Sequence, residues 1–120
     1  MDLDKIADFV QKYAPQYKNR EKIKEYVNLH LLYKTIFIGY DYNGDVSYVC
    51  RWNIEGNRVL VLDFYCREDY RNKGMIHILL KNALYYFPYL KEIGWERSGI
   101  RKKDRGIRYY PIENILKRKW

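Results

Sequence analysis

The chain carries only two cysteines and two histidines among its 120 residues. Two cysteines cannot form the disulfide framework of a small secreted domain. A four-ligand zinc site would need Cys50, Cys66, His30 and His77 together, at spacings that match no known zinc pattern. We therefore expect reduced thiols and no tightly bound metal.

Long apolar runs and linker-like segments are also missing. No apolar run approaches the roughly 18 residues of a membrane span, and the start, MDLDKIADF, is acidic and amphipathic, unlike a signal peptide. We therefore expect a cytoplasmic protein without a membrane partner. Repeats and Gly/Ser-rich stretches are absent, and 48% of the residues are hydrophobic, enough to bury a core. Residues 1–120 should form a single domain.

Acidic residues become scarce toward the C-terminus. Residues 97–120 contain nine Lys/Arg and two Asp/Glu, and so carry +7 of the formal net charge of +8. This basic segment favours an anionic partner, such as nucleic acid, a phosphate-rich ligand or an acidic protein surface. A solvated segment that only keeps the protein soluble is the alternative.

Hydrophobic periodicity divides the first half of the chain into helices and strands. Apolar side chains at three- and four-residue spacing predict helices over residues 3–13 and 18–33, with Pro15 ending the first. From Thr35 the period changes to that of strands, which are predicted over residues 35–42, 46–53 and 58–66. The three strands should form an antiparallel meander.

Two glycine-containing turns should connect these strands. Asn43-Gly44 suits a type I′ hairpin turn, in which both central residues have positive φ. A second turn centred near Gly56 would oppose residues whose numbers sum to about 112. Cys50 would then face Leu62 and Cys66 would face Val46, which leaves the two cysteines too far apart for a disulfide.

The second half of the chain should complete the sheet and cover it. A helix is predicted from about Lys73 to Phe87, followed by a strand over residues 89–96. The basic stretch 97–106 should be a loop, and residues 107–116 a final short strand or extended segment. The fold class is therefore α+β, with a mixed, mostly antiparallel sheet and helices on both faces.

The junction between strand 58–66 and the next helix has the chemistry of an anion site. A helix that begins directly after a strand points its unpaired N–H groups and positive dipole end at the sheet edge. Gly74 lets a ligand approach the backbone, and Arg71 and Lys73 add positive charge. These features suit a pyrophosphate. A strand, loop and helix with a chance glycine is the alternative.

The segment LDFYCREDYRNKGMIHILL (62–80) resembles the acetyl-CoA-binding motif of the Gcn5-related N-acetyltransferase (GNAT) superfamily. That motif has an apolar strand, an Arg/Gln-x-x-Gly-x-Gly/Ala loop and a helix with two leucines, matched here by Arg71, Gly74 and Leu79-Leu80. The order of elements extends the resemblance to about residues 33–96, as in a small, divergent and truncated member. It implies acetyl-CoA as co-substrate, without a metal, and transfer of an acyl group, most simply acetyl, to an amine of an unknown acceptor.

The resemblance also implies which residues bind the cofactor. Backbone groups at the strand end would hold the pantetheine arm, and amides around the first helical turn would hold the pyrophosphate. The residues so implied are Phe64, Tyr65, Cys66, Arg67, Arg71, Asn72, Lys73, Gly74, Met75 and Ile76. Ile76 departs from the family, which has a small residue there, so the pyrophosphate is expected to sit less closely.

Attack of an amine on a thioester needs an acid for the leaving thiolate and a base for the amine. The resemblance makes Tyr109 or Tyr110, which follow strand 89–96, the candidate acid, and core packing is the alternative for either. Asp63 is the candidate base, because a carboxylate on a half-buried strand is costly to bury and a place at the substrate cleft would account for it. Pairing with Arg51 or Arg58 is the alternative. The rival interpretation of the whole chain is a non-catalytic module that binds nucleic acid or an acidic protein through the basic segment.

Overall fold

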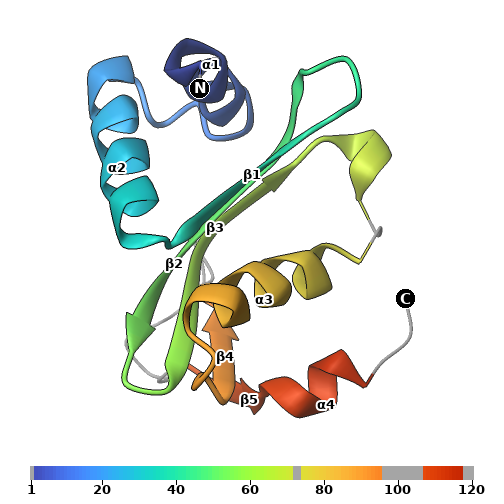
Figure 1. The fold of residues 1–120 in the computed structure, drawn as a ribbon. Coiled ribbons are helices and arrows are strands. Elements are labelled where there is room, and N and C mark those ends of the chain that lie inside the picture. Colours follow the sequence, from blue (N-terminus) through green and yellow to red (C-terminus); the bar gives the residue numbers. More distant parts are fainter. Residues whose placement is uncertain (1, 72–73, 96–106, 118–120) are drawn as a thin grey trace.

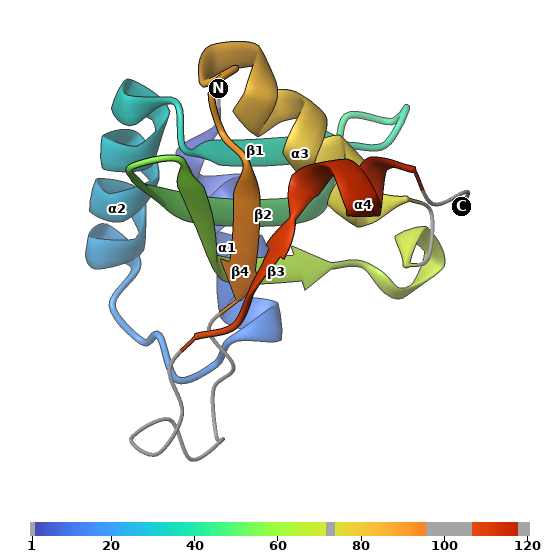
Figure 2. The ribbon, with the colours of Figure 1, turned by 90° about the horizontal axis from the view of Figure 1, so that it is seen from below.

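A computed structural model of the protein describes residues 2–71, 74–95 and 107–117. The elements are, in chain order, α1 (Leu3–Tyr13), α2 (Arg20–Tyr33), β1 (Ile36–Tyr40), β2 (Val46–Glu55), β3 (Arg58–Cys66), the 3-10 helix η1 (Glu68–Tyr70), α3 (Met75–Tyr86), β4 (Glu92–Trp95), β5 (Tyr109–Pro111) and α4 (Ile112–Leu116). The strands form one mixed sheet in the order β1-β2-β3-β4-β5, in which only the pair β3 and β4 is parallel. Helices α1 and α2 cover one face and α3 and α4 the other (Figures 1 and 2). The predicted α+β class is confirmed.

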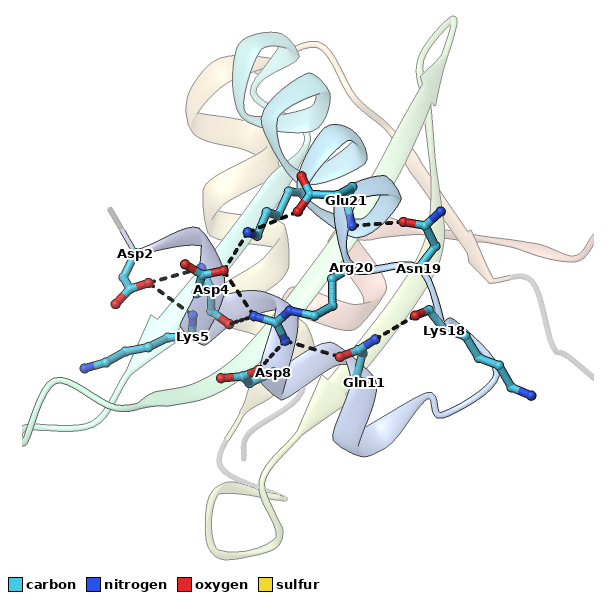
Figure 3. A network of polar contacts seen from close by, with 10 residues as sticks. Asp2, Asp4, Lys5, Asp8, Gln11, Lys18, Asn19, Arg20 and Glu21 are labelled. Carbon is cyan, nitrogen blue, oxygen red and sulfur yellow. Dashed lines mark hydrogen bonds and ion pairs between the residues drawn. The ribbon is translucent and has the colours of Figure 1, made fainter.

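Helices α1 and α2 pack against each other and are joined by charged contacts (Figure 3). Asp2 and Asn19 cap them, each accepting two backbone N–H groups of the first turn. The Arg20 guanidinium bonds to the carboxylates of Asp4 and Asp8. Exposed ion pairs of this kind contribute little to stability. Their main effect is therefore to orient the two helices.

Each face of the sheet buries its own hydrophobic cluster. The cluster under α1 and α2 includes Ile6, Val10, Ile23, Val27 and Val49. The cluster under α3 and α4 includes Trp52, Val59, Val61, Leu79, Leu80, Ile93, Ile112 and Ile115. Burying one large apolar side chain stabilises the fold by about 1.5–3 kcal/mol. The second cluster fixes α3 under the sheet, with its first turn at the end where β3 stops (Figure 1).

Most of the predicted elements are confirmed to within two residues, while β4 begins three residues later than predicted. The prediction for residues 107–116 is wrong in its second half, because β5 ends at Pro111 and α4 follows it. Ile112 and Ile115, three residues apart, are both buried in the cluster under α3 and α4, which favours a helical turn there. None of the described helices is long and apolar enough to cross a membrane.

The prediction of a type I′ turn is wrong. Among the described residues of the first hairpin, only Gly44 has a positive φ, of 85°. The Asp41 carboxylate accepts the backbone N–H groups of Asn43 and Asp45, at 2.9 and 3.0 Å, and so closes a wider loop. A side chain that bonds to nearby backbone competes with a tight turn.

The predicted strand register is also wrong, by two positions. Cys50 faces Phe64 and Cys66 faces Tyr48. The first one-residue shift of the register occurs at the turn, where Glu55 opposes Arg58. The second occurs further along the strands, where β3 carries one extra residue. Both cysteines are free and buried.

Candidate active site

Strands β3 and β4 part from one another halfway along β3. They pair only over residues 58–61 and 92–95. Leu62 then forms a bulge, an extra residue between the β3 residues that face Arg51 and Trp52. A bulge bends the strand that carries it. Beyond it, β3 has no second neighbouring strand within the described chain; residues 62–66 and the end of β4 at Trp95 are called the fork below.

The fork exposes particular backbone groups of β3. The Arg67 N–H donates to Ser47 O of β2 at 2.8 Å, and in an antiparallel pair alternate residues bond to the same neighbour. The backbone groups of Phe64 and Cys66 therefore point away from β2, toward the unpaired edge. An unpaired strand edge can pair with an extended ligand.

Helix α3 begins beside the fork without a side-chain cap. Its N-cap residue Gly74 has φ 71° and ψ 34°, a left-handed conformation that favours glycine. Asp2 and Asn19 cap α1 and α2, whereas no described side chain does so for α3. Arg71 is exposed just before this turn, and its Nε donates to the Cys66 carbonyl at 3.4 Å. Uncapped amides beside a guanidinium attract an anion.

The first turn of α3 also contains the residue that departs from the family motif. Ile76 is half-buried and packs against the cluster under α3 and α4. The branched side chain of Ile76 thus packs in the core. This packing gives no support to the expectation that Ile76 makes a pyrophosphate sit less closely. Met75 is the first residue of α3 and is half-buried. Asn72 and Lys73 lie outside the described residues, and their roles stay predictions.

The Arg67 side chain is held by two carboxylates. Its Nη1 lies 2.8 Å from Asp41 Oδ2, and its Nε lies 2.8 Å from Asp69 Oδ1. The hydrogen bond from Arg67, followed by those from the backbone, lowers the pKa of Asp41. The side chain therefore ties the segment after β3 to the β1–β2 hairpin, and only the backbone of Arg67 belongs to the strand end.

The two thiols are in the protonated form at neutral pH. Cys66 Sγ lies 3.3 Å from the Arg67 carbonyl, to which it donates, and burial raises the pKa of Cys66. Burial raises the pKa of Cys50 to about 12. Because the thiolate is the nucleophilic form, these side chains favour direct transfer over a route through an acyl-cysteine.

Asp63 lies in an ion pair with Arg51 of the neighbouring strand, which is one of the alternatives that the sequence left open. The two side chains are 10% and 18% exposed. The Tyr65 hydroxyl donates to the other carboxylate oxygen at 3.2 Å, and burial, followed by the charge of Asp63, raises the pKa of Tyr65. Both carboxylate oxygens thus have a donor. The role of Asp63 as a catalytic base stays a prediction.

Arg51 also contacts a group of polar residues that no local sequence pattern predicted. The guanidinium carbon lies 4.5 Å from the centroid of the Tyr26 ring, and Nη1 lies 3.2 Å from His30 Nε2. Thr35 Oγ1 donates to the His30 carbonyl at 3.4 Å, so at 2.8 Å it accepts from His30 Nδ1. Burial, followed by the charge of Arg51, lowers the pKa of His30. These residues come from α2, β1 and β2 and form no local motif.

Strand β5 places the two candidate tyrosines on opposite faces of the sheet. Tyr109 faces Gly94 across the β4–β5 pair, and its ring occupies the space that a side chain at Gly94 would fill. The same ring lies 4.6 Å from the Arg58 guanidinium. Tyr110 packs edge-on against Trp95, with 5.8 Å between the ring centroids. Successive residues of a strand point to opposite faces, so only one of these tyrosines shares a face with Asp63.

That tyrosine is Tyr109, by the register of the sheet. Gly94 pairs with Leu60 of β3, and Leu60 and Asp63 lie on the same face because the bulge at Leu62 shifts the alternation by one. Tyr109 therefore lies two strands from β3, on the face that carries Asp63 and Tyr65. Asp63 and Tyr65 of β3 and Tyr109 of β5 therefore lie on the α1/α2 side of the sheet, with Tyr109 beside Arg58 at the start of β3.

Most of the basic segment lies outside the described residues. Of the part that is described, Arg108 and Lys117 are exposed. The predicted nucleic acid or acidic protein partner stays a prediction. In the described ranges, no group of three or more His, Cys, Asp or Glu residues could hold a metal ion.

Solved structures match this fold, although no protein-family model and no curated protein matches the sequence. A GNAT-family acetyltransferase from Streptococcus pneumoniae gives a TM-score of 0.56 at 18% identity, over 99% of this chain and 81% of that one. A proposed acetyltransferase from Pyrococcus horikoshii gives 0.60 at 10% identity, over 82% of this chain. This chain spans only 36% of the length of the Pyrococcus protein. The PaiA N-acetyltransferase from Thermoplasma acidophilum, in complex with coenzyme A, gives 0.50 at 15% identity, over 86% and 77%.

These likenesses establish the fold. The chain shares a mixed sheet covered by helices with these solved acetyltransferases, and the resemblance found in the sequence is confirmed at the level of the fold.

Proposed function

We propose that this chain is an acyl-CoA-dependent N-acyltransferase, which moves an acyl group, most simply acetyl, from coenzyme A to an amine. The observation that carries the proposal is the fork beside the uncapped start of α3. A free strand edge suits the extended pantetheine arm, and an amide-rich helix end beside it suits the pyrophosphate to which that arm leads. The coenzyme A bound to the PaiA N-acetyltransferase, which shares this fold, supports the proposal.

The described residues fit such a ligand. Phe64 and Cys66 offer backbone groups to the amides of the pantetheine arm. Arg71 and the amides of Met75 and Ile76 would hold the pyrophosphate, which Gly74 would leave uncovered because it has no side chain. Coenzyme A supplies a thioester whose carbonyl carbon an amine can attack, with the thiol as leaving group. Asn72 and Lys73 join this proposal on the resemblance alone.

For the acid we propose Tyr109 rather than Tyr110. Burial raises the pKa of Tyr109, so its hydroxyl keeps a proton at neutral pH that it can give to the leaving sulfur. Tyr110 packs against Trp95 on the other face. We assign Asp63, which is paired with Arg51, to positioning Tyr65 and not to deprotonating the amine.

Tyr109→Phe should lower turnover about 100-fold and leave the affinity for acetyl-CoA unchanged, because one hydroxyl contributes little to binding the whole ligand. The rate is measured as thiol release from acetyl-CoA with a panel of primary amines, and the affinity by calorimetry. Tyr110→Phe is the matched control and should turn over at the wild-type rate. Equal turnover in Tyr109→Phe and wild type would contradict the assignment.

A further inference from the structure

Strand β1 forms one edge of the sheet and pairs only with β2 among the described strands (Figure 2). Although helices cover both faces of the sheet, each of the four side chains of β1 is half-buried or exposed. Val49 and Cys50, which face two of these residues across the pair, are fully buried. The side chains of β1 are therefore open on the side that faces away from β2.

The outer edge of β1 also carries a row of backbone groups with no partner strand in the described chain. The Thr35 carbonyl accepts from an N–H of β2 at 2.9 Å, and the Asp41 N–H donates to the residue before β2 at 2.8 Å. Alternate residues of an antiparallel strand bond to the same neighbour, so the odd-numbered residues between these two also face β2. The residues whose N–H and carbonyl groups point outward are Ile36, Ile38 and Tyr40.

The two edges of the sheet differ in how they are protected against pairing with another strand. The other edge, β5, has only three residues and contains Pro111, which has no N–H to donate. The five residues of β1, IFIGY, are all described and include neither a proline nor a charge. The extra residue of the β1–β2 pair, Ser47, lies in β2, so β1 itself carries no bulge. Prolines, charges, bulges and very short strands are the usual protection of an edge, and β1 uses none of them.

We infer that β1 pairs with β1 of a second copy of this chain, antiparallel and about a two-fold axis at Ile38. The outward residues are spaced symmetrically about this position. Ile36 of one copy therefore faces Tyr40 of the other, Ile38 faces Ile38, and every outward N–H and carbonyl group has a partner. A two-fold axis of this kind is the commonest symmetry of soluble homo-oligomers.

The side chains on the α3 face fit this register. Phe37 would face Gly39 of the second copy, at a pair where antiparallel strands approach each other most closely. Gly39 adds no side chain there, and the ring of Tyr48 occupies the space that its Cβ would fill. Within one copy the rings of Phe37 and Tyr48 lie 5.4 Å apart. The pairing would bring Phe37 against Tyr48 of the second copy as well, so that aromatic contacts cross the junction.

The end of α2 adds apolar surface beside the same edge. Leu29, Leu32 and Tyr33 are exposed and come shortly before β1. Exposed apolar residues that lie together often mark an interaction surface. Because the two β1 strands would run antiparallel, the β1–β2 hairpin of the second copy would lie next to this end of α2. That hairpin carries Tyr42, which is 98% exposed in the single chain. The chain therefore supplies apolar partners for its own exposed residues, which favours a second copy over an unrelated peptide.

Sedimentation velocity of the wild-type chain, from micromolar to near-millimolar concentrations, should show a dimer. Tyr40→Lys places a charge opposite Ile36 of the second copy and should fold, since Tyr40 is 45% exposed. Each dimer would contain two such lysines, so a tenfold loss at each should raise the dissociation constant about 100-fold. The matched control is Tyr110→Lys, which makes the same change at a residue 39% exposed on the opposite edge of the sheet. It should dimerise as wild type does, and circular dichroism checks that both variants fold.

The register can be tested with a short cross-linker for thiols. The native cysteines, Cys50 and Cys66, are buried and should react little. A mixture of Ile36→Cys and Tyr40→Cys should give linked dimers that contain one chain of each, because these residues would face each other. Neither variant alone should cross-link, since each residue would lie about 14 Å along the strands from its own copy.

Three results would overturn the inference. The first is a wild-type chain that stays monomeric at near-millimolar concentration, and the second is a Tyr40→Lys variant that dimerises as tightly as Tyr110→Lys. The third is a wild-type dimer in which Ile36→Cys and Tyr40→Cys do not cross-link to each other. The proposed function stands or falls separately, because β2 separates β1 from the fork, and Tyr40→Lys should bind acetyl-CoA with the wild-type affinity.

Discussion

Gly74→Glu should leave the chain folded but unable to bind acetyl-CoA. The glutamate would place a carboxylate at the start of α3, where the pyrophosphate is proposed to bind, and would cap the amides that the phosphates need. It would also have to adopt φ 71°, which costs a residue other than glycine about 1–3 kcal/mol. Binding is measured by calorimetry with acetyl-CoA and folding by thermal melting.

The control for backbone strain is Gly44→Glu. Gly44 also has a positive φ, of 85°, and its Cβ position is open space in the β1–β2 hairpin. Both variants should lose similar stability, while Gly44→Glu keeps the wild-type affinity for acetyl-CoA. If Gly74→Glu bound acetyl-CoA as tightly as Gly44→Glu does, the start of α3 would not be the pyrophosphate site.

Asp63→Asn should lower the free energy of unfolding by about 3 kcal/mol or more, because it leaves the largely buried Arg51 without its counter-charge. For a domain of this size the melting temperature should fall by about 10 °C or more. The variant keeps the size of the side chain and an oxygen that can accept from Tyr65. Thermal and urea unfolding of both proteins measure the difference.

Two comparisons separate this ion pair from other effects. Glu92→Gln removes the acid of an exposed pair with Arg58, whose side chains are 34% and 50% exposed, and should change the free energy of unfolding far less than Asp63→Asn does. Arg51→Met combined with Asp63→Asn should be more stable than the sum of the single changes predicts, by about 2 kcal/mol. If Asp63→Asn abolished turnover without loss of stability, Asp63 would be the base and not a positioning residue.

Local patterns predicted the elements of the fold well because each depends on residues close together in the chain. The apolar spacing in residues 3–13 and the alternation in 58–66 are examples, and both elements form as predicted. The short helix α4 could not be predicted, since five residues are too few for a helical period. The bulge at Leu62 depends on how three strands pair, and the turn at Gly44 depends on the side chain of Asp41. The strand pairing is not visible in a single segment, whereas Asp41 lies only three residues before Gly44.

The same distinction applies to the candidate site. Arg71 and Gly74 lie within one short motif, so the anion site proposed at the start of α3 could be inferred from sequence alone. The pairing of Asp63 with Arg51 was only one of two alternatives until the strand register was known.

The most direct test of the account is a thermal melt of the wild-type chain over a range of acetyl-CoA concentrations. A ligand that binds only the native state stabilises it by about 2.7 kcal/mol at 100 times its dissociation constant. The account predicts a melting temperature that rises steadily with acetyl-CoA. A melting temperature that stays constant up to millimolar acetyl-CoA would contradict it, because the fork and the start of α3 would then have no such ligand.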